Sequence, residues 1–533
     1  MLSPNLKEND KNVSRPRFDQ PPRASPLRRA RHFLHDVRSL SRLARGHVGA
    51  SDTRHVQEPQ PSRRVSALPS IDGARAAAGS FRDPQGQVIE FGERVFRALL
   101  APAAPFPATW SQPGPLSDLV ATGKLWPALP LTPDAVPREV LSRAPSATGF
   151  LEHPRLAPIS YPFEWPFELL KRAALLHLEL HRELLRRGFT LSDGFAYNVQ
   201  FVGTRPTFID ALAIVPYVEG QPWAGHGQFC ESFLNPLLLA ARGNDSWQAT
   251  YRGRLRGIAT RETARELGWF GALRAGVFMH VILDSQQGAR TRVDTAAHRP
   301  KFSKAGLDLL LGSLTRAIRR LELPETRAPN WGAYETGNSY SAAQRAEKLA
   351  VVKAFVERTR PKLLVDVGCN AGEYSAVALE SGAKSVVGLE RDTAAVHGAV
   401  NRGDRFAGRF LPLQIDIQNM SPAQGWNLAE RTALARRIEP DALLCLALLH
   451  HLVLGECVPL TLAVPCIVSL APQGIVEFVP PNDPMARRIA GPPERLTHRY
   501  DLETFLAVLS QSARISSQKP LGEHGRVLVE YQR

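Results

Sequence analysis

The chain has 533 residues, too many for one hydrophobic core, because single domains stop growing at roughly 250–300 residues. A hydrophobic share of 44% with 22% charged residues is ordinary for a globular protein and excludes wholesale disorder. The formal charge of +15 is concentrated at the start, since residues 1–65 hold 14 Lys/Arg and 6 Asp/Glu. A basic tail attracts any polyanion, whether RNA, anionic lipid or acidic polysaccharide, so the charge alone does not identify a partner.

Residues 1–80 predict a basic and mostly disordered tail, because Arg, Pro and Ser replace large apolar residues there. Inside the tail, apolar residues recur at helical spacing over 27–44 with arginines between them, which predicts an amphipathic helix. Such a helix would contact a membrane surface or a partner, or it would dock on the rest of the chain. The sequence leaves both interpretations open.

The cysteines and the apolar segments indicate where the protein resides. None of the five cysteines forms a pair with zinc-site spacing, and their odd number favours free thiols in a reducing cytoplasm. The N-terminus has no apolar signal segment. The most apolar stretch, 443–471, is interrupted by histidines, a glutamate and prolines, so we expect no transmembrane segment and a cytoplasmic protein.

Residues 85–320 predict an α+β domain. Two strands should flank a tight turn at Gly92, and a Pro- and Ala-rich loop should follow over 101–135. A long helix is expected over 163–187, because leucines and alanines at 169, 170, 173, 176, 180 and 184 form one apolar stripe. The elements expected after it are short strands at 199–202 and 206–209 and helices over 225–325.

Residues 331–533 predict an α/β domain, separated from the preceding one by a linker around 321–330. Helical and strand patterns alternate along this part, which is typical of a mostly parallel sheet covered on both faces. The helices are expected at 342–358, from 374, and at 393–401. The strands are expected at 363–367, 385–389, 411–414, 442–446, 474–479 and 525–531.

The most informative run, 363–375, places an apolar strand directly before a glycine turn and a helix. Gly368 and Gly372 allow a sharp turn and a close approach of ligand to backbone. Asp366 near the end of the first strand suits an ammonium group, and Glu390 at the end of the second suits ribose hydroxyls. Carboxylates there would repel a pyrophosphate, so the turn Gly368-Cys-Asn370-Ala-Gly372 does not predict a dinucleotide site.

This ordered set resembles class I S-adenosylmethionine-dependent methyltransferases and implies a Rossmann-like domain that binds S-adenosylmethionine. By the resemblance, Asp416 and Ile417 after the third strand lie near the adenine. The cofactor residues it implies are Asp366, Gly368, Asn370, Gly372, Glu390, Asp416 and Ile417, and no metal is implied.

The segment after the fourth strand resembles the family's acceptor-site lining and holds His450 and His451. Either imidazole could act as a general base for O- or N-methylation, or the pair could cap and pack the next helix. Glu477 and Tyr340 are further pocket candidates that could equally be structural. Methyl transfer needs no base where the acceptor is already nucleophilic, so positioning could suffice.

The first domain has a second resemblance, to the catalytic loop of kinase-like phosphotransferases. By this match Asp193 is base-like, whereas Asn198 and Asp210 would hold a metal only if the domain were active. A phosphate-cradling glycine loop, a strand lysine with its helix glutamate, and the His-Arg before Asp193 are not found. The departures favour a relic fold used for acceptor binding or scaffolding.

The whole layout of 85–533 resembles a group of two-domain bacterial proteins, some of them nodulation-associated methyltransferases. This resemblance implies methyl transfer to a small-molecule or glycan acceptor, with no specific nucleic acid as partner. The alternatives are a nucleic-acid methyltransferase and a non-catalytic scaffold with relic enzyme domains. If the amphipathic helix of the basic tail does not dock on the rest of the chain, the tail could add a contact with a membrane surface.

Overall fold

The computed structural model describes residues 73–100, 114–274, 277–283, 303–324, 341–490, 498–522 and 525–533. The predicted helix over 27–44 and Tyr340 lie outside the described residues. We call residues 73–324 the N-terminal region and 341–533 the C-terminal region. The residues from Ser70 to Arg533 belong to one compact unit, in which both regions contribute to a shared buried cluster.

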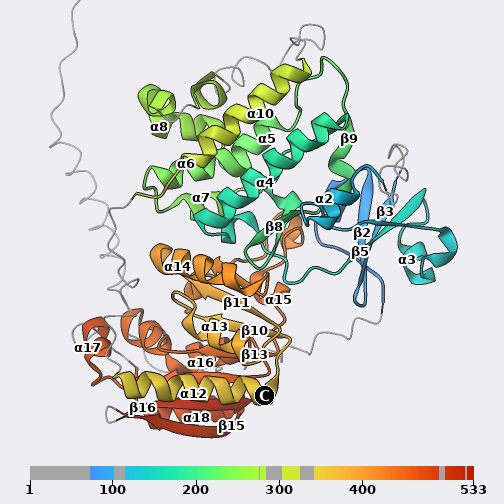
Figure 1. The fold of residues 1–533 in the computed structure, drawn as a ribbon. Coiled ribbons are helices and arrows are strands. Elements are labelled where there is room, and N and C mark those ends of the chain that lie inside the picture. The colour runs from blue at the N-terminus through green and yellow to red at the C-terminus, as the bar shows by residue number, and fades with distance from the viewer. Residues whose placement is uncertain are drawn as a thin grey trace, which may run out of the picture. The chain divides into compact units, whose positions relative to one another are not determined.

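The N-terminal region begins with an antiparallel sheet (Figure 1), whose strand order is β1-β2-β3-β5-β4. The predicted hairpin is confirmed, since Gly92 has φ +56° between β2 and β3. The tail was predicted to extend to residue 80, which is too far, because residues 75 and 76 already form strand β1 and pair with β2. The strands are β1 (Arg75–Ala76), β2 (Gly86–Phe91), β3 (Arg94–Leu99), β4 (Leu129–Leu131) and β5 (Gly149–Pro154).

The loop predicted over 101–135 is wrong for the part that the structure describes. Leu116 and Leu119 are buried and anchor a short helix, α2 (Ser117–Ala121). Strand β4 extends the sheet despite Pro130, which an edge strand tolerates because it needs fewer backbone donors.

The central helix of the N-terminal region is α4 (Phe167–Arg186). All six residues of its predicted apolar stripe are buried. The helix begins four residues later than predicted, because Pro166 cannot continue a helical hydrogen-bond pattern from the preceding short turn. Gly188, at φ +86°, follows its end.

Short strands and helices make up the rest of this region; of the strands, only the pair within 199–209 was predicted. The strands form two small antiparallel pairs, β6 (Phe189–Leu191) with β9 (Ile214–Pro216) and β7 (Val199–Val202) with β8 (Arg205–Phe208). The helical elements are α5 (His226–Phe229), η7 (Cys230–Leu234), α6 (Asn235–Ala241), α7 (Trp247–Arg252), α8 (Thr260–Arg274), η8 (Met279–Leu283) and α10 (Lys304–Arg319).

The C-terminal region is a Rossmann-like α/β sheet, as predicted. Its strand order is β12-β11-β10-β13-β14-β16-β15; the first five strands are parallel, and β16 is antiparallel to both neighbours. The strands are β10 (Leu363–Val367), β11 (Ser385–Glu390), β12 (Phe410–Gln414), β13 (Ala442–Cys445), β14 (Gln473–Phe478), β15 (Arg514–Leu521) and β16 (Arg526–Gln532).

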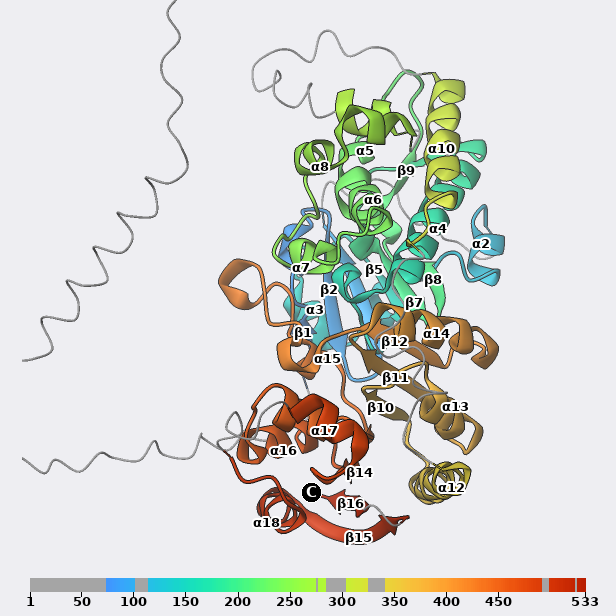
Figure 2. The ribbon, with the colours of Figure 1, turned by 90° about the vertical axis from the view of Figure 1, so that its left-hand side faces the viewer.

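Helices cover both faces of this sheet, and Figure 2 shows α12 and α13 on one side and α16 and α18 on the other. The sequence analysis missed β15, because this exposed edge strand is polar and lacks an apolar alternation. The helices are α12 (Ala342–Thr359), α13 (Glu373–Glu380), α14 (Thr393–Gly403), α15 (Leu434–Arg437), α16 (Leu460–Val468), α17 (Pro484–Ala490) and α18 (Leu502–Ser512).

The segment between β12 and β13 joins the C-terminal region to the N-terminal region. Arg437 forms an ion pair with Glu164 in which both side chains are buried, and its guanidinium lies 3.8 Å from the Tyr161 ring centroid. The Tyr161 hydroxyl accepts the Thr432 N–H at 2.9 Å. A buried charge that loses its partner is costly, so Arg437 should matter for stability.

We expect Arg437→Ala to lower the free energy of unfolding by about 3–5 kcal/mol, because Glu164 is left buried without its cation. The matched control is Arg499→Ala, which breaks an exposed ion pair with Asp501 and should leave the free energy of unfolding nearly unchanged, because solvent screens the pair. Denaturant unfolding measures both. Equal effects of the two variants would contradict the prediction.

Candidate functional site

The turn between β10 and α13 is built from residues with left-handed backbone. Gly368, Asn370 and Gly372 have φ values of +74°, +49° and +79°. A Cβ added at Gly372 would lie 2.7 Å from the Phe410 ring, so no larger residue fits without displacement. The Asn370 side chain accepts the N–H of Ala371 at 2.6 Å, which fixes the turn locally. The predicted glycine turn is therefore present and tightly constrained.

Asp366 is buried beside this turn, near the end of β10. Burial raises the pKa of its carboxyl to about 6, and the Ser375 hydroxyl donates to it at 2.6 Å. Ser375 lies in the first turns of α13 and was not singled out from the sequence. A carboxylate buried in this way is a ready partner for a cationic group of a ligand.

Glu390 ends β11, the strand next to β10, and ties the glycine turn to the sheet. Its Oε2 accepts the Asn370 N–H at 2.9 Å, and its Oε1 accepts the Asp392 N–H at 2.8 Å. Burial raises the pKa of Glu390 above its usual value. Each carboxylate oxygen has a second lone pair, so Glu390 retains capacity to accept hydroxyl donors.

Asp416 and Ile417 follow β12, which pairs with β11 through Glu390 and Gln414. The Asp416 carboxylate caps a short helical turn by accepting the Gln418 N–H at 3.0 Å, and it lies 3.9 Å from Arg391. Ile417 is half-buried at this point. The structure thus places Asp366, Glu390 and Asp416 at the carboxyl ends of three neighbouring strands, where open α/β sheets bind ligands.

His450 and His451 follow β13 at the start of a π-helical turn, η13 (His451–Gly455). Their ring centroids are 4.3 Å apart. His450 is buried, and neither of its ring nitrogens has a hydrogen-bond partner among the described residues. Burial lowers the pKa of His451 to about 4 and that of His450 well below its usual value, so both imidazoles are neutral near pH 7.

A buried charge network lies behind this segment, and the sequence analysis recognised only Glu477 of it. Glu477 accepts from Lys348 at 2.7 Å and from Arg526 at 3.2 Å, and Arg526 also donates to Asp483 at 2.9 Å. All four side chains are nearly inaccessible to solvent, and the two cations balance the two carboxylates. The sequence pattern of α12 does not distinguish Lys348 from an exposed helix lysine, so the sequence analysis did not single it out.

Glu477 also fixes the backbone of the acceptor-side segment. Its Oε2 accepts the N–H of Ala447 at 2.9 Å, and Ala447 has φ +50°, a left-handed conformation that is strained for alanine. The next residue, Leu448, lies over the glycine turn, because a Cβ at Gly368 would be 3.3 Å from its side chain. The buried network therefore positions the segment that closes over the turn.

The second predicted constellation, in the N-terminal region, is also brought together. Asn198 donates to Asp193 at 2.6 Å, and burial together with the charge of Asp210 raises the pKa of Asp193 to about 7. Arg97, which the sequence analysis missed although β3 presents it, forms ion pairs with Asp210 and, at 3.4 Å, with Asp83. The Arg97 guanidinium thus pairs with Asp210, the carboxylate that would hold a metal ion according to the resemblance to kinase-like phosphotransferases.

Within the part of the chain that the structure describes, no group of three or more His, Cys, Asp or Glu side chains is arranged to hold a metal ion. None of the described helices is long and apolar enough to cross a membrane. None of the five cysteines, all of which lie in the described part of the chain, forms a disulfide bond.

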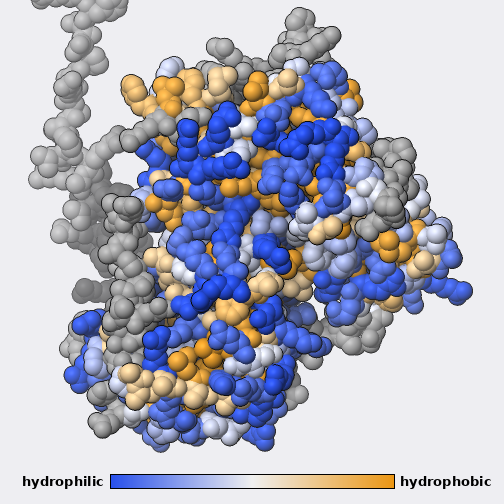
Figure 3. Space-filling view, in the orientation of Figure 1, coloured by the Kyte–Doolittle hydropathy of each residue, from blue (hydrophilic) through white to orange (hydrophobic). Residues whose placement is uncertain are grey.

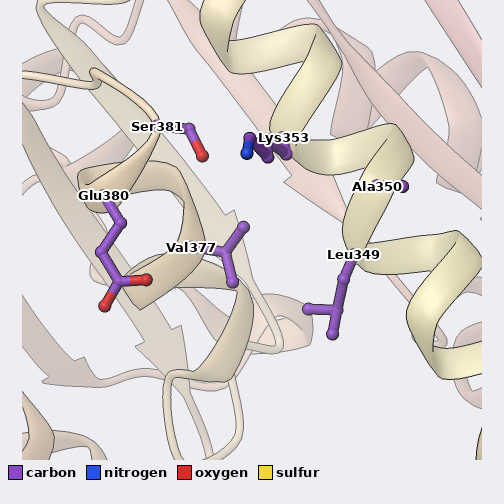
Figure 4. A pocket seen from close by; sticks show the side chains of 6 residues that line it. All are labelled: Leu349, Ala350, Lys353, Val377, Glu380 and Ser381. Carbon is purple, nitrogen blue, oxygen red and sulfur yellow. The ribbon is translucent and has the colours of Figure 1, made fainter.

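Figure 4 shows a hollow of about 290 Å³ between α12 and α13. It contains none of the predicted cofactor residues. Lys353 comes from α12, whereas Glu380 ends α13 and Ser381 follows it, eight and nine residues beyond Gly372. The hollow is therefore separate from the candidate site.

Comparison with known structures finds methyltransferases of low overall similarity. N-methyltransferase NodS from Bradyrhizobium japonicum WM9, in complex with S-adenosyl-L-homocysteine, is 13% identical over 38% of this chain and 96% of its own, with a TM-score of 0.28. The methyltransferase domain of bacterial CtHen1-CN is 15% identical over 36% of this chain and 100% of its own, with a TM-score of 0.26. WbdD is 14% identical over 37% of this chain and 43% of its own, with a TM-score of 0.27.

Comparison of sequences gives a closer relationship. No protein-family profile matches the chain. The nodulation protein NoeA of Rhizobium meliloti (strain 1021) is 39% identical over 480 residues, which cover 89% of this chain and 98% of the relative. This identity extends over both regions and leaves almost none of the relative unmatched. The chain therefore belongs to the family of the nodulation protein NoeA.

Proposed function

We propose that the protein is an S-adenosylmethionine-dependent methyltransferase whose cofactor binds at the carboxyl ends of β10, β11 and β12. The observation that carries the proposal is the pair of carboxylates, buried Asp366 and half-buried Glu390, on either side of a left-handed glycine turn. The strand order is compatible with it, because β16 runs antiparallel between β14 and β15 and the sheet is therefore not a uniformly parallel dinucleotide-binding sheet.

The residues present fit this cofactor. Glu390 retains acceptor capacity for two ribose hydroxyls, and Asp366 supplies a negative charge for an ammonium group. Asp416 and the half-buried Ile417 would contact the adenine. A pyrophosphate fits poorly, because both carboxylates would face its negative charge. The cofactor, when bound, supplies an electrophilic methyl group on a sulfonium.

The acceptor side of the site would work by positioning and by exclusion of water. Leu448 covers the glycine turn, and neutral His450 and His451 line the adjoining segment. Neutral imidazoles with depressed pKa values are weak bases, which favours an acceptor that is already nucleophilic or a hydrogen-bonding role for His451. We place the acceptor among small molecules or glycans, and the enzyme in the cytoplasm.

The N-terminal region would serve as a scaffold or acceptor-binding platform rather than as a phosphotransferase. The Arg97–Asp210 ion pair supports this role, because a guanidinium occupies the carboxylate that would otherwise hold magnesium. The extensive contacts of the β12–β13 segment with this region support a shared folding unit.

Calorimetric titration with S-adenosylhomocysteine tests the cofactor site. We expect wild-type binding, and Glu390→Ala should weaken it by roughly 1–3 kcal/mol because the ribose hydroxyls lose their acceptor. Glu390→Gln, which keeps one acceptor oxygen, should lose less. The control is Glu380→Ala, an exposed residue at the other end of α13, with unchanged affinity. Unchanged affinity in Glu390→Ala would refute the ribose assignment.

The same titration should depend on pH through Asp366. Its pKa of about 6 means that the carboxylate protonates as the pH falls through 6 and can no longer pair with an ammonium group. Affinity should therefore be constant above about pH 7 and fall by up to about tenfold per pH unit below the pKa. Asp366→Asn should bind weakly at every pH. A wild-type affinity that stays constant from pH 8 to pH 5 would contradict this role.

Asp193→Ala tests the scaffold role of the N-terminal region. We expect its affinity for S-adenosylhomocysteine to equal that of the wild type, because Asp193 contacts Asn198 and not the C-terminal sheet. We also expect no heat from ATP–magnesium with either protein. Saturable ATP–magnesium binding by the wild type that Asp193→Ala abolishes would show an active nucleotide site instead.

A further inference from the structure

The helical part of the N-terminal region exposes a group of large apolar side chains on α8 and η8. Phe270 is 89% exposed, and Trp269, Leu273 and Met279 are 60%, 56% and 66% exposed. Single exposed hydrophobic residues are common on protein surfaces and need no explanation. Four in one short stretch are unusual, and we call these four residues the α8 patch.

The α8 patch is contiguous and rests on a buried base. The Trp269 ring lies 5.2 Å from the Phe278 ring, next to Met279, and residues three or four apart on a helix share a face. Beneath them, Ala272 is fully buried. Figure 3 shows hydrophobic residues gathered at the upper left, over α8. The exposed apolar side chains therefore project from a helix that buried residues hold against the rest of the protein.

Arginines lie near the α8 patch. The Arg242 guanidinium lies beside it, because a Cβ at Gly271 would be 3.8 Å from that group, and Arg261 and Arg265 are exposed in the part of α8 that precedes a break at Gly268. Of the acids on α8, Glu262 forms an ion pair with Arg254, and Glu266 accepts a hydrogen bond from the amide of Asn244. Residues 225–283 and 303–324 hold eleven Lys/Arg against six Asp/Glu, so the helical part that carries the patch has a net positive charge.

We propose that the α8 patch docks on the surface of an anionic lipid bilayer. Aromatic and aliphatic side chains rimmed by arginine suit the boundary between head groups and acyl chains, where the apolar groups insert and the cations meet lipid phosphates. A second copy of the chain suits the patch less well, because a two-fold contact would bring the same arginines face to face. This docking is independent of the methyltransferase proposal.

Vesicle co-sedimentation of the full chain tests the proposal. Vesicles of equimolar phosphatidylcholine and phosphatidylglycerol are used at about 0.15 M salt, where the Debye length is about 8 Å and the attraction of the basic tail is weakened. Phe270→Ser/Leu273→Ser should lower the partition coefficient about tenfold or more, because two inserting side chains are lost.

The matched control is Trp426→Ser/Leu428→Ser, which removes an aromatic residue and a leucine that are 74% and 68% exposed in the C-terminal region. It should bind vesicles like the wild type, as the tail is the same in all variants. Equal loss in both double variants, or no loss in the α8 variant, would overturn the proposal. Circular dichroism confirms that each variant is folded, as expected for such exposed positions.

Two further measurements separate charge and self-association from lipid docking. Arg242→Gln should weaken binding to the anionic vesicles and leave the weaker binding to pure phosphatidylcholine vesicles unchanged. Light scattering of the free protein should give the same mass for the wild type and Phe270→Ser/Leu273→Ser. A wild-type dimer that this variant dissociates would overturn the proposal and assign the α8 patch to a second copy.

Discussion

The Glu390 carboxylate holds the candidate cofactor site together. It accepts one backbone N–H from the glycine turn, at Asn370, and another from the start of the next helix segment, at Asp392. These bonds lock the turn after β10 to the end of β11, so both strands present their carboxyl ends in one fixed geometry. Gly372 can approach Phe410 only because the turn is held in this position. A ligand that bound here would meet a preformed surface.

A second constraint is the buried charge network around Glu477, which contacts the segment that follows β13. Glu477 is buried, and its charge is tolerated because Lys348 and Arg526 neutralise it and the Ala447 N–H completes its hydrogen bonds. Burial lowers the pKa of Lys348, yet the adjacent carboxylate favours its charged form. The network thus joins α12, β14 and β16 under the segment that carries Leu448, His450 and His451. The ion pairs and the Ala447 N–H offset the cost of burying these charges, and the same contacts fix the backbone beside the site.

The N-terminal region contributes in a different way. Within this region, Arg97 forms an ion pair with Asp210 of the acidic cluster. Glu164 of the same region forms an ion pair with Arg437, which lies in the segment between β12 and β13. That segment starts at Asp416 and Ile417, the residues assigned to the adenine. Arg252 of the N-terminal region donates to the Asn419 carbonyl at 2.8 Å, so the region contacts this segment close to Asp416 and Ile417, and the exposed α8 patch lies on another part of its surface.

The sequence by itself determined the alternation of strands and helices after residue 341, the stripe of α4, and the glycine turn with its two carboxylates. These features are local: apolar periodicity, glycines at fixed spacing, and acids at strand ends require no knowledge of distant contacts. The start of α4 was predicted four residues too early, although Pro166 marks it locally. The edge strands β4 and β15 and the partners Lys348, Arg526 and Arg97 were not predicted. Only the tertiary structure decided them, because an edge strand is defined by its neighbour, and a buried cation is defined by a carboxylate far away in the sequence.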